Sequence, residues 1–123
     1  MFADSLYTRS SLKVADSVLI AEIELNPAHP LYAGHFPDAP VLPGVVQLQI
    51  LKEILEGHFG RKLLLKEMRT CKFLRIINPF ETSGLVIEAK MKETDSLEVV
   101  ASVSHADMVY LKAQVSYTFC SNA

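Results

Sequence analysis

One histidine lies in a proline-punctuated loop that runs directly into a helical pattern. His35 is followed by Pro37, Pro40 and Pro43, and Gly44 opens the helix-like run. Each proline fixes its own φ and restricts the residue before it, so the loop has little freedom to lose on folding and can hold one side chain still. Gly44 lets another molecule approach the backbone, and a helix start offers unpaired N–H groups at the positive end of the helix dipole. An imidazole beside such a helix start favours chemistry on a carbonyl compound.

A strand and a helix are expected on either side of this loop. The alternation of apolar and polar residues over 19–25 predicts a half-buried strand. After the loop, a helix is predicted from Pro43 to about Gly57–Gly60, with Gly60 as its C-terminal stop. Its apolar face is so wide that other structure should wrap the helix. The positions on this face are Leu48, Ile50, Leu51, Ile54, Leu55 and Phe59.

The second half of the chain has the pattern of strands. A long strand is predicted over 63–77, ending at Asn78 and Pro79, and alternating patterns predict further strands over 85–92, 97–104 and 109–119. One central helix followed by a run of antiparallel strands indicates an α+β fold rather than α/β.

Composition narrows the class of protein. The chain has 123 residues, enough for one domain with a real core, so residues 1–123 are expected to form a single domain. Half of the residues are hydrophobic and the net charge is −2, which excludes a disordered chain and gives no overall signal for nucleic acid or membrane. Only Cys71 and Cys120 are present, with no signal-peptide pattern, so a reduced cytoplasmic setting is expected.

Basic residues gather in the middle of the chain. Their concentration indicates either a surface that docks an acidic partner or ordinary solvated helix and strand faces. The residues are Lys52, Arg61, Lys62, Lys66, Arg69, Lys72 and Arg75.

The loop and a later strand resemble a known enzyme signature. Residues 34–37 read Gly-His-Phe-Pro, residues 40–45 read Pro-Val-Leu-Pro-Gly-Val, and residues 72–79 read Lys-Phe-Leu-Arg-Ile-Ile-Asn-Pro. Together they are similar to the signature of the β-hydroxyacyl-(acyl carrier protein) dehydratases of fatty-acid synthesis. The resemblance implies a hotdog fold, a curled antiparallel sheet around a long central helix. Gln49 departs from the family, which has Glu or Asp at this position.

The resemblance also implies roles for three residues in dehydration of a β-hydroxyacyl thioester to a trans-2-enoyl thioester. His35 would be the base, the N–H of Gly44 would polarise the thioester carbonyl, and Gln49 would stand where the family has its acid. Three routes follow from this substitution. His35 performs both proton transfers, a neighbour such as Asp38 supplies the acid, or only acyl binding remains. By helical spacing alone, Gln49 belongs to a solvent-facing stripe that it shares with Lys52, Glu53 and Glu56.

The resemblance further implies how substrate and partners would be held. The expected substrate-binding residues are Phe36, Pro37, Val45, Phe73 and Phe80, although core packing explains Phe73 and Phe80 equally well. Lys72 and Arg75 are expected to dock the acidic acyl carrier protein. A homodimer is implied, with His35 of one subunit facing Gln49 of the other, and with no metal or organic cofactor. The two alternative functions are a hotdog thioesterase and a non-catalytic acyl-binding protein.

Overall fold

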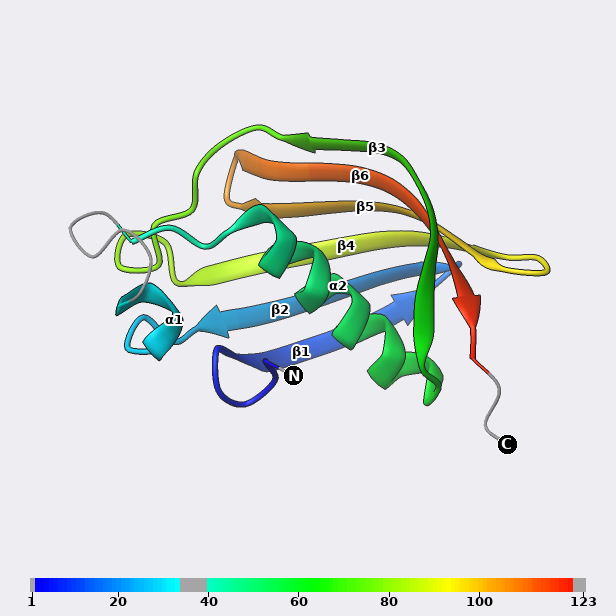
Figure 1. Ribbon diagram of the computed structural model, residues 1–123, viewed down its shortest axis with the longest axis horizontal. Coiled ribbons are helices and arrows are strands. Elements are labelled where there is room, and N and C mark those ends of the chain that lie inside the picture. Colours follow the sequence, from blue (N-terminus) through cyan, green and yellow to red (C-terminus); the bar gives the residue numbers. More distant parts are fainter. Residues whose placement is uncertain (1, 34–39, 121–123) are drawn as a thin grey trace.

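Six antiparallel strands form one sheet, and a long helix lies along one face of it (Figure 1). The computed structural model describes residues 2–33 and 40–120. The strands are β1 (Tyr7–Ala15), β2 (Val18–Leu25), β3 (Leu63–Phe73), β4 (Gly84–Glu93), β5 (Leu97–His105) and β6 (Met108–Phe119). The helices are α1 (Pro30–Ala33) and α2 (Gly44–Phe59). The strand order is β1-β2-β4-β5-β6-β3, which leaves β1 and β3 as the two edges.

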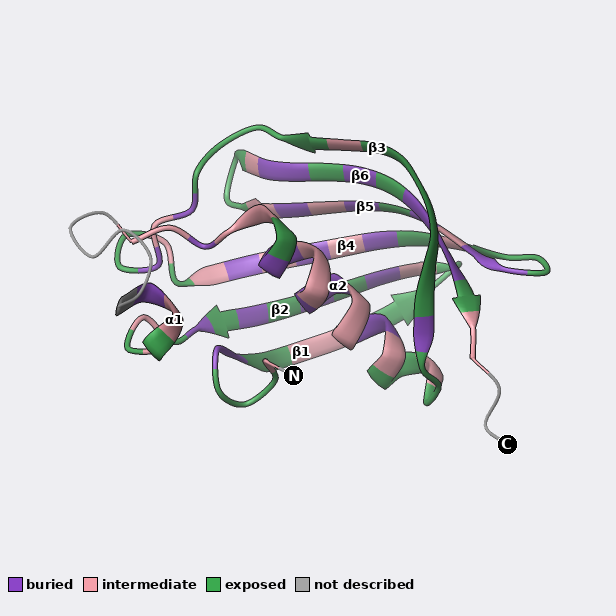
Figure 2. Ribbon diagram, viewed as in Figure 1, coloured by how far each residue is buried: buried purple, intermediate pink, exposed green. Residues whose placement is uncertain are grey.

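The alternating patterns produce the strands that they predict. In β2 the burial alternates along the whole strand, and it alternates over most of β4 and β5, whereas in β6 two runs, 110–111 and 115–117, are buried without a break (Figure 2). The buried residues of these strands and of α2 form one hydrophobic core. Residues directly opposite each other on neighbouring strands, such as Ala89 and Ala101, lie on the same buried face of the sheet. These four expected strands and the α+β class are therefore confirmed, and the sheet with its single long helix is a hotdog fold.

Helix α2 begins and ends where the sequence predicts. Gly60 takes a left-handed conformation, with φ 66°, and its N–H bonds to the carbonyl of Glu56 at 2.8 Å. Such a residue is the usual C-terminal stop of a helix. On the inner face, Ile50, Leu51, Ile54 and Leu55 are buried as expected, while Leu48 and Phe59 are only partly buried. The last two positions lie at the margin of the face that the sheet covers.

Two parts of the fold differ from the sequence prediction. Strand β1 carries no buried alternation and was not predicted. The strand predicted over 63–77 ends at Phe73, so the prediction was wrong for 74–77. Both the Leu74 and Arg75 N–H groups bond to the carbonyl of Tyr110, which ends the regular ladder with β6. The chain then turns toward the start of α2.

Candidate functional site

The start of α2 is held in place by the segment that leaves the sheet after β3. The Leu42 N–H donates to the carbonyl of Ile77 at 2.9 Å, and Ile77 is fully buried. Pro43 is the residue that caps the helix, with φ −61° and ψ 148° and no side-chain cap. Among the described residues, the N–H of Gly44 has no recorded acceptor, whereas those of Val46 and Gln47 bond to Pro43. This bare N–H at the helix start is the chemical feature expected from the sequence.

Phe73 packs directly on Gly44, so the structure brings these two predicted site residues together. A Cβ atom added at Gly44 would lie 2.5 Å from Cζ of Phe73, closer than any ordinary carbon contact. A larger residue at this position would therefore push the Phe73 ring out of its present place. The Phe73 side chain is 55% exposed, so it is not a core residue.

Gln49 lies in a groove between α2 and the sheet edge. The groove has a volume of about 200 Å³. Its walls are Val45, Leu48 and Lys52 from α2, Leu65 and Met68 from β3, and Val115 and Tyr117 from β6. Val45, another predicted substrate-binding residue, is 73% exposed beside it. Gln49 is therefore half-buried against an apolar groove rather than on an open solvent face.

The amide of Gln49 is bonded to a carboxylate one helical turn away. Its Nε2 donates to Oε2 of Glu53 at 3.1 Å. Glu53 also accepts hydrogen bonds from the backbone N–H groups of Phe2 and Ala3 and from the hydroxyl of Tyr7. Burial would raise the pKa of Glu53, but the hydrogen bonds from Gln49 and the two N–H groups outweigh burial and hold it below 4.5. Glu53 therefore stays ionised near neutral pH and is not the missing acid.

Four of the residues named from the sequence are not part of this geometry. His35, Phe36, Pro37 and Asp38 lie outside the described residues. Phe80 is described, and it lies in the turn after β3, where it is 67% exposed and its N–H bonds to Oδ1 of Asn78. The core-packing interpretation is therefore wrong for both Phe73 and Phe80.

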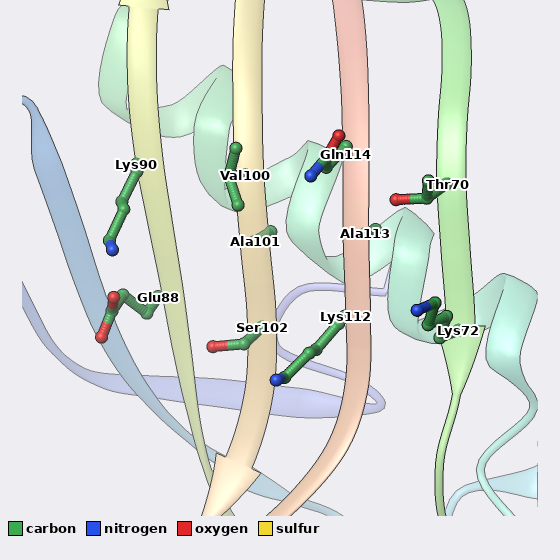
Figure 3. A pocket seen from close by; sticks show the side chains of 10 residues that line it. All are labelled: Thr70, Lys72, Glu88, Lys90, Val100, Ala101, Ser102, Lys112, Ala113 and Gln114. Carbon is green, nitrogen blue, oxygen red and sulfur yellow. The ribbon is translucent and has the colours of Figure 1, made fainter.

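Lys72 lies on the opposite face of the sheet from α2, in a hollow of about 330 Å³ (Figure 3). It is directly opposite Lys112 on β6, and Lys90 of β4 lines the same hollow. Among the described residues none of these lysines is within an ion pair, and like charges placed opposite each other cost stability. Arg75 lies beyond the end of β3, on the other side of Phe73 in the sequence.

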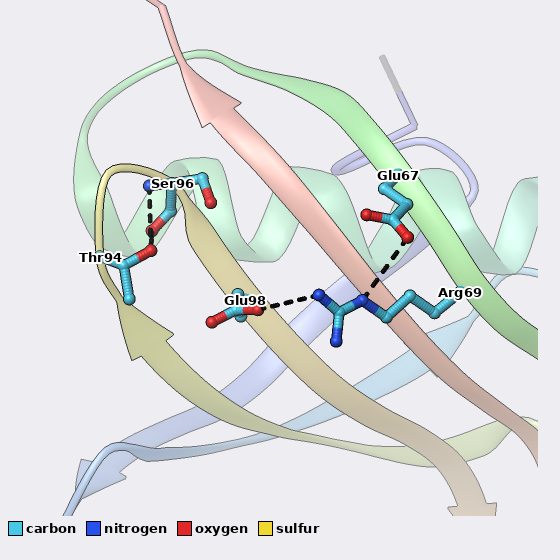
Figure 4. Close-up of polar contacts among 5 residues, drawn as sticks. All are labelled: Glu67, Arg69, Thr94, Ser96 and Glu98. Carbon is cyan, nitrogen blue, oxygen red and sulfur yellow. Dashed lines mark hydrogen bonds and ion pairs between the residues drawn. The ribbon is translucent and has the colours of Figure 1, made fainter.

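Arg69 differs from these lysines because it is already neutralised. Its guanidinium pairs with Glu67 at 3.6 Å and with Glu98 of β5 at 3.5 Å (Figure 4). Of the basic residues gathered in the middle of the chain, Lys72 is thus better placed than Arg69 to meet an acidic partner.

The described residues also bear on cofactors and membranes. Within 2–33 and 40–120, no group of three His, Cys, Asp or Glu side chains is arranged to hold a metal ion. Cys71 and Cys120 are free thiols. Over the same residues, no helix has the length and apolar character required to cross a bilayer.

Comparison with known proteins identifies the family. Residues 11–111 match the ApeI-like family, described as the ApeI dehydratase. The chain belongs to the ApeI-like dehydratase family. It is 24% identical over 105 residues to the 3-hydroxyacyl-(acyl-carrier-protein) dehydratase FabZ of Chloroflexus aggregans, covering 80% of this chain and 73% of the relative. It is 27% identical over 104 residues to the FabZ of Streptococcus agalactiae, covering 78% and 73%.

Solved structures support the fold of this ApeI-like chain. The dehydratase heterocomplex ApeI:P from Xenorhabdus doucetiae superimposes with a TM-score of 0.72 at 18% identity, covering 90% of this chain and 96% of that one. The putative thioesterase yhdA from Lactococcus lactis superimposes with a TM-score of 0.68 at 6% identity, covering 97% and 95%. At these identities the likeness concerns the fold alone.

Sequence reasoning missed three polar residues of this ApeI-like chain. Gln47 is 4% exposed, its Nε2 donates to the Leu42 carbonyl at 3.4 Å, and its Oε1 has no partner in the described part of the chain. Tyr117 lines the Gln49 groove, and burial together with the charge of Glu56 raises its pKa to about 12. Glu53 was assigned only to a solvent stripe. The spacing of four residues between Gln49 and Glu53 was the one available signal.

Proposed function

We propose that this chain dehydrates β-hydroxyacyl thioesters carried on acyl carrier protein to trans-2-enoyl thioesters, in fatty-acid or related lipid or polyene synthesis. The observation that carries the proposal is the Gly44 N–H at the start of α2, which has no acceptor among the residues that the structure describes. It follows the His35 loop in the sequence, inside a segment that matches a dehydratase family. Such an N–H stabilises negative charge that develops on a thioester oxygen.

His35 performs both proton transfers in this proposal. The imidazole removes the α-proton, and the electron pair of that bond forms the new carbon–carbon double bond as the bond from Cβ to the hydroxyl oxygen breaks. The imidazolium then gives the proton to the departing hydroxyl, which leaves as water. The Gly44 N–H polarises the thioester carbonyl, and Gln49 hydrogen-bonds the substrate hydroxyl. No metal or organic cofactor takes part, because a titratable base and a polarised carbonyl supply the chemistry.

The proposed active form is a homodimer in which His35 of one subunit faces Gln49 of the other. Its support is the apolar surface around the groove, where Val45, Leu65 and Met68 remain exposed beside the free edge of β3. Exposed apolar surface next to an open strand edge favours pairing with another chain. The ApeI:P structure is a dehydratase heterocomplex, so a related second chain is the alternative to a second copy.

The proposed docking surface for acyl carrier protein includes Lys72 and Arg75. Lys72 lies on the face of the sheet opposite to α2, whereas the neighbouring Phe73 packs on Gly44. Because β3 is an edge strand, a carrier bound at Lys72 would pass its thioester around this edge to reach the start of α2. Lys112, directly opposite Lys72, adds positive charge to the same surface. An acidic partner would offset the repulsion between these two lysines.

The thioesterase alternative comes from hotdog structures such as yhdA. A hydrolase of this kind needs an acidic group to activate water, and among the described residues that line the Gln49 groove there is none. The nearby Glu53 is bound to the N-terminal backbone instead. This arrangement favours dehydration.

Incubation with a crotonyl thioester of pantetheine separates the three functions. We expect hydration to the β-hydroxybutyryl thioester, which is the reverse of the proposed reaction and requires no carrier. Release of free thiol would identify a thioesterase. Saturable binding without turnover would identify a non-catalytic acyl-binding protein, and either of these results would overturn the proposal.

A further inference from the structure

Glu53 joins three parts of the molecule to the amide of Gln49. It accepts from the N–H groups of Phe2 and Ala3 at 3.0 Å, from the hydroxyl of Tyr7 at 3.2 Å, and from Nε2 of Gln49 at 3.1 Å. The first three donors belong to the N-terminal segment and β1, about fifty residues away in sequence. The carboxylate is therefore fixed from outside α2 and is not free to follow Gln49.

A carboxylate that stays ionised can only accept hydrogen bonds. The low pKa of Glu53 means that it carries no proton near neutral pH, so the Gln49 atom that faces it must be Nε2 and not Oε1. Among the described residues, Oε1 of Gln49 has no recorded hydrogen-bond partner. The orientation of this amide is thus set by chemistry and leaves its carbonyl oxygen for another donor.

We propose that Glu53 is a positioning residue that holds Gln49 so that its Oε1 accepts a hydrogen bond from the β-hydroxyl of the substrate. This inference rests on the proposed dehydration. A hydroxyl that donates its proton to Gln49 keeps its oxygen lone pairs free to receive a proton from the His35 imidazolium. Gln49 thereby aligns the leaving group, while the proton itself comes from His35.

The same geometry predicts how acid substitutions behave. Gln49→Glu alone would place a second carboxylate four residues from an ionised Glu53, and like charges at this spacing repel on a helix. The double variant Gln49→Glu/Glu53→Gln keeps one hydrogen bond between the two positions with donor and acceptor exchanged. We expect this double variant to turn over faster than Gln49→Glu alone. Equal or slower turnover would contradict the inference.

A double-mutant cycle on a short β-hydroxyacyl thioester separates positioning from a purely structural role. We expect Glu53→Gln to lower kcat by about tenfold, the effect of misaligning one hydrogen bond to the reacting group, with KM changed less than about threefold. In the Gln49→Ala background, Glu53→Gln should change kcat by less than about twofold, because no amide remains to be held. An equal loss in both backgrounds would show that Glu53 acts through the fold alone.

Tyr7→Phe is the matched control for the other contacts of Glu53. It removes the hydroxyl that donates to Oε1 and leaves the bond from Gln49 to Oε2. We expect a lower unfolding temperature and unchanged kcat. A loss of kcat as large as that of Glu53→Gln would overturn the inference.

A measurement without substrate keeps this inference separate from the proposed function. In a ¹⁵N-labelled protein, the side-chain amide resonance of Gln49 should move in Glu53→Gln and stay in place in Tyr7→Phe. If the wild type had no turnover, the proposed function would fail, and the resonance would still decide whether Glu53 holds Gln49. An unmoved resonance in Glu53→Gln would overturn the inference.

Discussion

The contact between Gly44 and Phe73 makes a strong prediction about Gly44→Ala. Alanine by itself favours a helix over glycine by up to ~1 kcal/mol. Here its Cβ would lie 2.5 Å from Cζ of Phe73, so the ring has to leave its position. Overpacking of this kind costs about 1–3 kcal/mol, and because the ring is half exposed and can swing into solvent we expect the lower part, about 1–2 kcal/mol.

The assay is urea unfolding of the wild type, Gly44→Ala, Phe73→Ala and the double variant. All four are compared at one protein concentration, because the stability of an oligomer depends on concentration. Gly44→Ala should lower the free energy of unfolding by about 1–2 kcal/mol more in the wild type than in the Phe73→Ala background. At roughly 3–6 °C per kcal/mol for a chain of this size, thermal unfolding should show the same coupling. A coupling below about 0.5 kcal/mol would refute the contact.

Three further predictions concern charge and assembly. Because the pKa of Glu53 in the folded protein lies below its ordinary value of 4.5, the wild type should exceed Glu53→Gln in free energy of unfolding by its largest margin above that pH, and the margin should shrink on acidification. A margin that grows below pH 4.5 would contradict this. If the proposed homodimer forms through this groove, Leu65→Lys should dissociate it in ultracentrifugation at micromolar concentration, whereas Leu64→Lys, on the outer face of the same strand, should not. Charge reversal at Lys72 and Arg75 should weaken turnover of carrier-bound substrate strongly and of a short pantetheine substrate little, and equal effects would argue against docking.

The fold was predictable where one face of a strand is buried and the other is solvated. β2, β4, β5 and β6 have this environment, so their residues alternate. β1 is an edge strand with mostly exposed side chains, and no alternation marks it. The end of β3 depends on two N–H groups sharing the carbonyl of Tyr110, more than thirty residues further along the chain. Local patterns do not record such a contact.

The same distinction applies to the candidate site. The Pro43-Gly44 pair marks the start of α2 because both residues suit a helix start for local reasons. The packing of Phe73 on Gly44 and the bonds from the N-terminal segment to Glu53 join residues about thirty and fifty apart. Only the sheet topology brings them together, so sequence reasoning named Gly44 and Phe73 without their contact and left Glu53 on a solvent face.

The most direct test of the account is turnover of a β-hydroxybutyryl thioester by the wild type and by His35→Ala. The account predicts that the enoyl absorbance rises with the wild type and is nearly abolished in His35→Ala, because no other base is expected within reach. Both proteins should unfold at the same temperature, which excludes a folding defect. Undetectable wild-type turnover, or undiminished turnover by His35→Ala, would contradict the central claim.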